Sequence, residues 1–465
     1  MVTLDRGMGL LQAAATNIIG MVGVGPFLTI PLMVAAMGGP HIVYAWAYGA
    51  LLALCDGLVY AELGAALPGS GGPYVYLREA YRPFGLGRLM AFVFIFQVVL
   101  VAPLAIAGGA VGFADYLGFY WTSMPALQHN LVAAAVCVAV TALLYRDIRA
   151  IGRLAVVMLV VAVGTIGWVI VAGLFAASWQ RAFAFPPAAR RLDTGLLRAI
   201  GAAGLLAMYN YGGYNNVCNI GEEIRSPERT VPRAIVLSIV VVVVLYVAMS
   251  TVMLAVIPWQ EAQDTRTVAS LFIARTFSEP AAGRIAAMAM TALILFITAA
   301  SLYAVVLGYS RIPFAAARDG EFFEPFARLH PTKHFPHVSL LTICAVALPF
   351  CFFTLGQLVS WLIQVQILMQ FVWQCAAVIL LRRCRTDVAK PFRMWLYPAP
   401  ALVSLAMWLY IFFTASAAGM AFSFAFLATA VAAFFLFDRQ KRRLRIRRDD
   451  KKRGRPVEGP PSTNS

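Results

Sequence analysis

The chain has 465 residues, of which 61% are hydrophobic, and its mean hydropathy is +0.78. This composition excludes an ordinary soluble protein, because apolar runs of about 20 residues, long enough to cross the hydrocarbon core of a bilayer, recur along the sequence. The formal net charge of +16 would suit a nucleic-acid partner, but the basic residues follow the ends of the apolar runs, so none is expected.

Twelve apolar runs predict an all-α polytopic membrane protein with twelve transmembrane helices in one domain, residues 1–437. The runs cover about 8–36, 41–66, 86–113, 128–145, 151–176, 199–223, 233–258, 284–310, 338–355, 358–382, 397–414 and 416–437. Residues 438–465 are expected to form a basic cytoplasmic tail without regular structure. The seven cysteines lie almost all within the runs, which disfavours a disulfide framework, and no His or Cys cluster has metal-ligand spacing.

The distribution of Lys and Arg orients the chain. If both termini are cytoplasmic, 30 of the 37 basic side chains lie on the inner side and 7 on the outer side. The positive-inside rule therefore predicts a multi-pass protein of the plasma (inner) membrane with both termini in the cytoplasm. The polybasic segment 439–448 is typical of a stop-transfer signal, and it would also attract anionic lipid at about 1 kcal/mol per cation.

Glycines interrupt the first apolar run. Gly20, Gly23, Gly25 and Pro26 stand together in its middle. Pro26 cannot donate a backbone hydrogen bond and is well suited to begin a new helical segment. The pattern predicts a helix that breaks within the membrane and starts again.

The sixth run is interrupted in a similar way. Its residues 207–216 hold the pair Gly212 and Gly213, flanked by three tyrosines and three asparagines. Adjacent glycines weaken a helix by about 1 kcal/mol each relative to Ala, and irregular backbone at membrane depth is tolerated only where protein buries it or a wet cavity adjoins it. Two such breaks in corresponding positions of two halves indicate the substrate site of a secondary transporter.

Three segments resemble the amino acid-polyamine-organocation transporters, and within them the L-type amino-acid transporter branch. They are the break at 19–27, the helix end and loop at 60–64 and 70–76, and the sixth-span signature at 211–215 followed by Glu222, Glu223, Pro227 and Pro232. Pro26 departs from the family pattern, in which a branched aliphatic residue is usual. All three segments occur in the family's order, and that makes the resemblance specific.

The resemblance implies the leucine-transporter fold, in which two inverted repeats of five helices hold substrate between spans one, three, six and eight. The repeats would cover about 8–176 and 199–382, with extra helices at about 397–437. It also implies that Tyr209 is an aromatic gate. In the heteromeric branch a cysteine between spans three and four tethers a glycoprotein, but residues 115–128 contain none, so no disulfide-linked heavy chain is expected.

An amino-acid zwitterion needs donors for its carboxylate and acceptors for its ammonium group. The first break frees backbone N–H groups at a half-helix N-terminus, where the dipole favours an anion, and both breaks free carbonyl groups. The predicted substrate-binding residues are Gly20, Met21, Gly23, Val24, Gly25, Phe27, Tyr209, Asn210, Tyr211, Gly212 and Asn215. Alternatively, the glycines merely allow close helix packing, and the tyrosines and Asn215 pack or bond within the bundle.

Four further residues are candidates for coupling or gating: Asp56, Glu62, Arg153 and Ser301. Intramembrane carboxylates are costly and therefore suggest function; Asp56 would carry a proton or pair with a neighbour, and Glu62 would serve transport or cap a cytoplasmic network. Arg153 resembles in placement the lysine that replaces sodium in some proton-coupled relatives, or it is an orientation charge. Ser301 lies where sodium-coupled relatives place a hydroxyl ligand, but its neighbouring alanines supply no second hydroxyl, which disfavours sodium coupling.

The sequence thus predicts a secondary transporter of amino acids, working by proton-coupled symport or by exchange, without catalytic residues, cofactor or metal. A polyamine carrier is the alternative within the class, but it would need more pocket carboxylates than Asp56 and Glu62. A membrane-embedded enzyme would need a catalytic constellation on facing helices, whereas the five histidines fall at span ends or in loops. A channel would need a ring of filter residues in an oligomer.

Overall fold

The computed structural model describes residues 8–68, 72–146, 151–221, 224–331 and 335–452. For residues 146, 151–156, 188, 190, 440 and 442–452 it describes the backbone alone. The motif residues Glu222 and Glu223 lie outside the described part. Within that part the regular structure is helical, and an isolated parallel bridge joins Met8 to Ile224.

Eight helices of the described chain are long and apolar enough to cross a membrane. They are α3 (Val43–Ala66), α5 (Gly87–Leu117), α6 (Ala126–Arg146), α7 (Ile151–Ala176), α10 (Pro227–Val256), α13 (Pro280–Arg318), the continuous run of α15 (Leu355–Gln366), η6 (Ile367–Phe371) and α16 (Val372–Cys384), and α18 (Ala417–Lys452). The pair α1 (Leu10–Met21) and α2 (Gly25–Met37), bent by 52°, makes a ninth span if it is counted as one. Three shorter helices occupy the other predicted runs: α9 (Thr194–Tyr211), α14 (His337–Phe350) and α17 (Ala399–Thr414).

Short helices and turns connect the spans. They are α4 (Pro73–Ala80), α8 (Trp179–Ala182), α11 (Trp259–Asp264), α12 (Val268–Arg275), η1 (Arg82–Phe84), η2 (Pro187–Arg190), η3 (Asn216–Asn219) and η5 (Glu324–Ala327). The prediction of an all-helical, multi-pass membrane protein is confirmed, and the count of twelve spans and the inverted repeat stay predictions.

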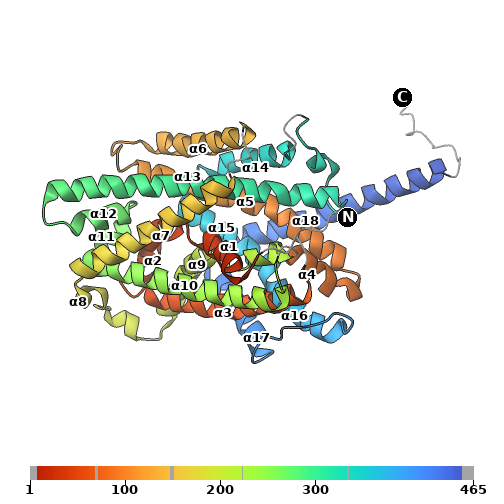
Figure 1. The fold of residues 1–465 in the computed structure, drawn as a ribbon, viewed down its shortest axis with the longest axis horizontal. Helices are drawn as coiled ribbons and strands as arrows, with labels where there is room; N and C mark the ends of the chain where they lie inside the picture. Colours follow the sequence, from red (N-terminus) through yellow and green to blue (C-terminus); the bar gives the residue numbers. More distant parts are fainter. Residues whose placement is uncertain (1–7, 69–71, 147–150, 222–223, 332–334, 453–465) are drawn as a thin grey trace.

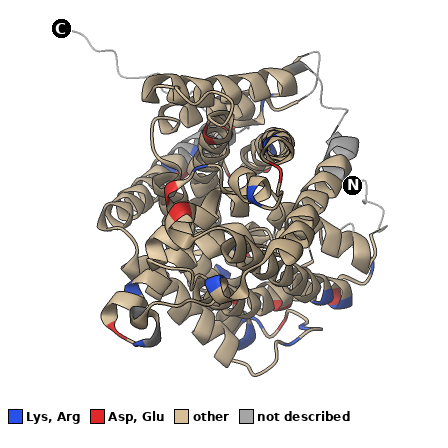
Figure 2. Cartoon of the chain, turned by 90° about the vertical axis from the view of Figure 1, so that its left-hand side faces the viewer, with Lys and Arg blue, Asp and Glu red and all other residues tan. Residues whose placement is uncertain are grey.

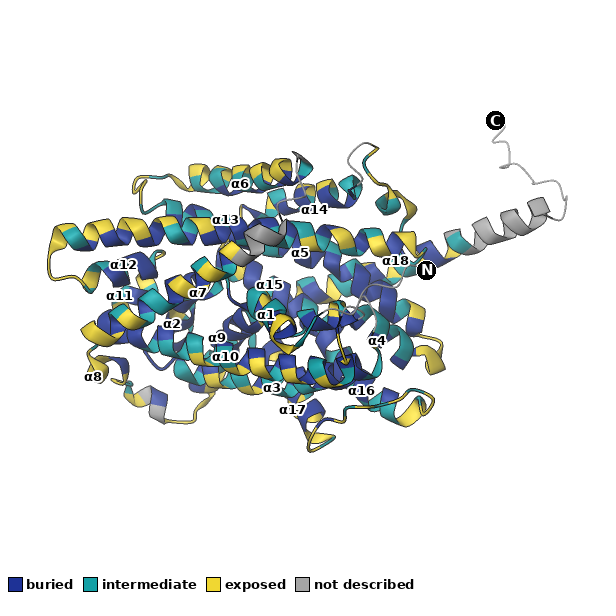
Figure 3. Cartoon of the chain, in the orientation of Figure 1, coloured by how far each residue is buried: buried dark blue, intermediate teal, exposed yellow. Residues whose placement is uncertain are grey.

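The long helices run along the long axis of the molecule (Figure 1). α5 packs against α13, α6, α14 and α15, and α3 packs against α10, α9 and α17. Buried residues gather where these helices meet, whereas α6 and α7 turn large apolar side chains outward (Figure 3). Such an extended apolar surface is what a lipid-facing helix presents.

Charged side chains collect at the ends of the bundle. We call one end the basic end; its ion pairs are Arg88–Asp438, Arg88–Glu321, Lys441–Glu321, Arg382–Glu62, Arg78–Glu79, Arg82–Glu79, Arg385–Glu79 and Arg385–Asp387. Here hydrogen bonds from Arg385 lower the pKa of the exposed Asp387 to about 2. At the opposite end, which faces the viewer in Figure 2, Arg266 and His129 both contact Asp115. Most of the chain between the two ends is uncharged, as a bilayer requires.

The sixth span differs from the predicted helix over 199–223. α9 ends at Tyr211, and the described residues between the glycine pair and 221 form the 3-10 turn η3 rather than a second α-helical half. Glycine and asparagine are weak helix formers; the backbone leaves the helical region at Gly212, whose ψ is 131°, and Gly213 then takes a φ of +114°. Beyond η3 the chain instead pairs with the N-terminal segment, where Arg225 N–H donates to the Met8 carbonyl at 3.0 Å.

The twelfth span also extends beyond its predicted boundary. α18 continues past residue 437, where a tail without regular structure was expected, and ends at Lys452. Its basic stretch is rich in Arg and Lys, which are strong helix formers, so the preceding helix continues through it.

Glu62 is fully buried at the basic end, on α3. Its carboxylate accepts hydrogen bonds from Arg382 Nε at 2.5 Å and Nη2 at 2.6 Å, and from the Met394 backbone N–H at 2.8 Å. The Arg382 guanidinium also lies 3.7 Å from the centroid of the Tyr397 ring. This geometry favours the alternative in which Glu62 holds a network at the helix ends together.

We expect Arg382→Met to lower the free energy of unfolding by about 3 kcal/mol, because it leaves the buried Glu62 carboxylate without its cation. Thermal unfolding in detergent would measure the change, and the double variant Glu62→Gln/Arg382→Met should regain part of it. Arg383→Met, at the exposed neighbouring position, is the matched control. Equal melting temperatures for the two Arg variants would contradict the ion pair's importance.

Candidate functional site

The two breaks meet each other inside the bundle. A Cβ atom at Gly213 would lie 2.8 Å from the carbonyl carbon of Gly20, and one at Gly20 would lie 2.0 Å from Asn216 Nδ2. Distances this short leave no space for a side chain: the Gly213 backbone touches the Gly20 backbone, and the Asn216 side chain lies against Gly20. Gly20 of the first break thus contacts the sixth break at Gly213 and Asn216, while the substrate-binding roles of Gly20, Gly212 and Asn215 stay predictions.

Asn210 joins α9 to α2 beside the first break. Its Nδ2 donates to Thr29 Oγ1 and to the Leu206 carbonyl, both at 2.7 Å. Because a carbonyl only accepts, the bond to Leu206 fixes which end of the amide is nitrogen. The buried Oδ1 has no hydrogen-bond partner among the described residues, and it lies 2.5 Å from where a Cβ of Gly25 would be. Leaving a buried acceptor unpaired lowers stability by about 1–3 kcal/mol, so a ligand that donates a hydrogen bond to this oxygen would bind favourably.

Gly25 begins α2, and the residue before it, Val24, makes no side-chain capping bond. The first backbone N–H groups of a helix have no partner within it, and their dipole favours an anion. Pro26 has no N–H, so Gly25 and Phe27 are donors of this turn. Free donors at the start of α2 thus stand next to the free acceptor of Asn210.

Asn17 joins the other two pieces of the broken spans. Its Oδ1 accepts from the Val217 N–H of η3 at 2.8 Å, and its Nδ2 donates to Ser238 Oγ on α10 at 3.2 Å. α1 is thereby bound to the turn after the sixth break. Asn17 was not predicted, although a fully buried asparagine in an apolar run is a usable signal.

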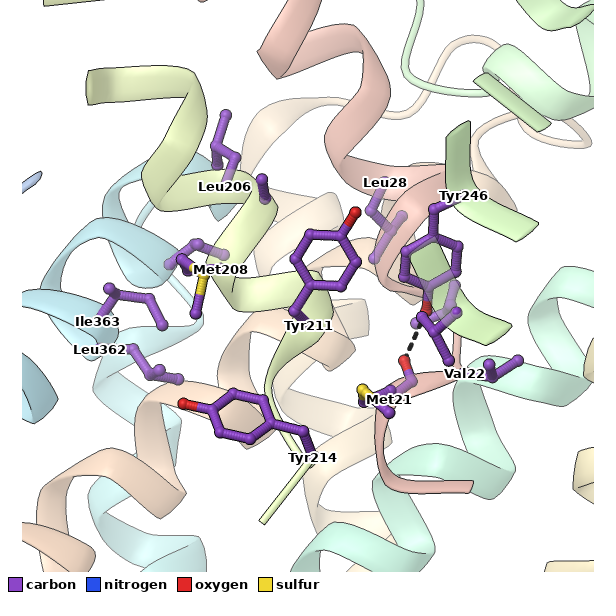
Figure 4. Packing of buried hydrophobic residues seen from close by; sticks show 14 of the residues in the cluster. Met21, Val22, Leu28, Leu206, Met208, Tyr211, Tyr214, Tyr246, Leu362 and Ile363 are labelled. Atoms are coloured by element: carbon purple, nitrogen blue, oxygen red, sulfur yellow. Dashed lines mark hydrogen bonds between the residues drawn. The ribbon is translucent and has the colours of Figure 1, made fainter. Parts of the chain in front are cut away.

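Two tyrosines satisfy carbonyl groups without helical partners: that of Met21 at the end of α1, and that of Phe27 in α2, whose partner position four residues on is Pro31, which has no N–H. Tyr246 Oη donates to the Met21 carbonyl at 2.6 Å (Figure 4), and Tyr116 Oη donates to the Phe27 carbonyl at 3.1 Å. The carbonyl of Met21, one of the predicted substrate-binding residues, thus already has one protein donor. The sequence offered no signal for Tyr246, which lies 225 positions away.

The remaining predicted residues fall into two groups. Tyr209 lies by the first break, its ring carbon 3.7 Å from a Cβ of Gly25, and Ser301 Oγ of α13 lies 3.4 Å from a Cβ of Gly23. Tyr211 instead packs between Trp46 and Tyr246, as the packing alternative expected.

The two other predicted coupling residues to place are Asp56 and Arg153. Asp56 reaches the sixth break through Tyr214, which is described below. The side chain of Arg153, at the start of α7, lies outside the described part of the chain.

A cavity of the described chain lies away from the junction. It measures about 460 Å³ and lies at the basic end between α6, α13 and α14, with Arg311 and Arg318 among its lining residues. None of the predicted site residues lines it. The polar groups of the junction are covered by packed side chains.

A multi-pass helical bundle with a broken first span that contacts a broken sixth span is the architecture of a membrane transporter. The chain belongs to the amino acid permease family, whose model matches residues 8–448. The resemblance to amino acid-polyamine-organocation permeases is thereby confirmed, and the family consists of transporters rather than enzymes.

Three relatives show the range of the family. The chain is 26% identical to the branched-chain amino acid permease BcaP of Bacillus subtilis, over 84% of each chain. It is 32% identical to an uncharacterised transporter of Mycobacterium tuberculosis, over 74% of this chain and 73% of the relative. It is 25% identical to the methylthioribose transporter of Bacillus subtilis, over 87% and 88%.

We expect Gly213→Ala to reduce folded protein and to abolish transport, because a side chain at φ +114° would meet the Gly20 backbone. Gly308→Ala is the matched control, since nothing lies within 4 Å of a Cβ there. Size-exclusion profiles and uptake would be compared. Normal behaviour of Gly213→Ala would show that the two breaks do not touch.

Proposed function

We propose that the chain is a secondary active transporter of amino acids, working by alternating access as a proton-coupled symporter or an exchanger. The observation that carries the proposal is the pairing of opposite polar groups at the junction. The free N–H groups at the start of α2 suit a carboxylate, and Asn210 Oδ1 beside them suits an ammonium group. Tyr209 is the proposed gate over them, and the backbone of Gly20, Gly23, Val24 and Gly212 borders the site.

The hydrogen bonds among the four segments that flank the breaks, α1, α2, α9 and η3, support alternating access. Asn210 ties α9 to α2, and Asn17 ties α1 to η3, so each half of the first span has a bonded counterpart from the sixth. The two pairs meet at the glycine contact of Gly20 and Gly213. Small residues allow one pair to tilt relative to the other, which would open the junction to one side at a time.

Family membership favours amino acids over polyamines. The two buried carboxylates of α3 are both engaged, Glu62 by Arg382 and Asp56 by neutral donors, so neither is free to bind a polyamine. A methylthioribose transporter among the relatives is the reason to test a broad panel. We place branched-chain and other neutral amino acids first, because no charged side chain of the described residues faces Gly25 or Asn210.

The proposed setting follows from the distribution of charge. The basic end of the bundle would face the cytoplasm, with both termini there, in the plasma membrane. The repeats of about 8–176 and 199–382 and the extra helices of 397–437 remain our proposed organisation of the domain. Anionic lipid is a proposed partner of the basic segment after Asp438, and no disulfide-linked heavy chain is proposed.

We expect Gly25→Val to abolish uptake while the protein still inserts, because its side chain would occupy the space between Asn210 Oδ1 and the α2 N-terminus. Uptake of radiolabelled amino acids into proteoliposomes measures this, with Gly308→Val as the exposed glycine control. Full uptake by Gly25→Val would exclude this junction as the carboxylate site.

The substrate class is tested on the unmodified protein. A panel of amino acids, methylthioribose and putrescine would be offered to proteoliposomes with and without an inward proton gradient, followed by counterflow. Amino-acid uptake with trans-stimulation is the expected result, since a channel shows none. Uptake of putrescine that amino acids do not inhibit would overturn the substrate assignment.

A further inference from the structure

Asp56 is a fully buried carboxyl group in the middle of α3 that the substrate site does not use. Four side chains donate to it. They are Ser404 Oγ (2.9 Å), Trp408 Nε1 (3.2 Å) and Cys375 Sγ (3.7 Å), all to Oδ1, and Tyr214 Oη to Oδ2. α3, α16, α17 and the sixth break thus converge on one carboxyl group.

No cation of the described residues faces this group. Its titratable neighbours are Cys55, Tyr60, Tyr214 and Cys375. The helices packed on α3 carry arginines only near their ends: Arg198 of α9, Arg229 and Arg233 of α10, and Arg383 of α16 are exposed, and Arg382 of α16 is bonded to Glu62. At the nearby Gly57, α10 presents Ile235 and Ile239.

Two large effects therefore oppose each other at Asp56. Burial without a cation disfavours the ionised form, whereas four donors favour it. A carboxyl group balanced in this way can exchange its proton with a modest change in its surroundings. Glu62, six positions along the same helix, has a cation and lacks this balance.

The geometry also fixes where the proton resides. Trp408 Nε1 only donates, so Oδ1 must accept in either protonation state, and the proton belongs on Oδ2. There Oδ2 meets the Tyr214 hydroxyl. In the ionised state Tyr214 donates to Oδ2; in the neutral state Oδ2 donates to Tyr214, whose own proton turns away.

Tyr214 connects this change to the junction. It follows Gly213, the residue that touches the Gly20 backbone, and its hydroxyl points away from Met21 (Figure 4). A bond to an ionised group is about twice as strong as a neutral one, so protonation weakens the hold of α3 on this segment. On the other oxygen of Asp56, the donor Trp408 is held in place, because its ring stacks on Phe371 with centroids 4.2 Å apart.

Resting on the transport function proposed above, we propose that Asp56 is the proton-coupling site, which takes up one proton on Oδ2 in each transport cycle and controls the sixth break through Tyr214. The proton comes from water on the outer side and is released to water on the inner side, with no other bond made or broken. The chain is thus a proton symporter, in which the proton gradient acts by making and breaking the hydrogen bond between Asp56 of α3 and Tyr214.

The test uses the full chain in proteoliposomes that contain pyranine to report internal pH. Wild-type protein should acidify the interior when substrate enters. Asp56→Asn keeps the shape but cannot ionise; it should lose about tenfold in gradient-driven accumulation while counterflow exchange continues. Asp319→Asn, at an exposed acid after α13, is the matched control and should behave as wild type.

Tyr214→Phe keeps the carboxyl group and supplies a second test should Asp56→Asn fold poorly. It removes a donor to the ionised state, so the pH of half-maximal uptake should rise by about one unit. An unchanged midpoint, or accumulation by Asp56→Asn equal to wild type, overturns the inference. Exchange by wild-type protein without proton movement overturns this inference alone, whereas absence of all amino-acid transport overturns the proposed function.

Discussion

The contact between Gly20 and Gly213 is the constraint on which the rest of the junction depends. Two chain segments approach until a single methyl group at either position would collide with the other. Each segment leaves peptide groups without helical partners, which costs several kcal/mol per group in a lipid environment. The breaks persist because each covers the other and because Asn17 and Tyr246 supply hydrogen-bond partners for their peptide groups from neighbouring helices.

Those partners also divide the junction into two mechanical units. The amide of Asn210 holds α9 against α2, and the amide of Asn17 holds η3 against α1, while the glycine contact between the units carries no side chain. Side-chain hydrogen bonds lie within each unit, whereas the units meet at the glycine contact and are joined by the short non-helical links 22–24 and 212–215, which favours relative tilting over internal deformation. The same division leaves donors of α2 and the acceptor of Asn210 in one unit, so their spacing would survive the movement.

The sequence predicted both breaks because glycine clusters in an apolar run have few other physical explanations. It predicted the second half of the sixth span wrongly, since periodic hydrophobicity cannot show that η3 is followed by pairing with Met8 rather than by helix. Partners hundreds of positions apart were beyond prediction. Glu62 and Arg382, or Met21 and Tyr246, are brought together by packing of whole helices, for which the local sequence carries no signal.

The two buried acids of α3 show why burial alone does not assign a function. Glu62 has a bidentate arginine and a backbone donor, so its charge is compensated and its removal would cost mainly stability. Asp56 has donors but no cation among the residues that the structure describes, and one of those donors belongs to the segment that contacts Gly20. A charge that is hydrogen-bonded yet not neutralised can be lost and regained, and its partner at the break gives that change a mechanical outcome.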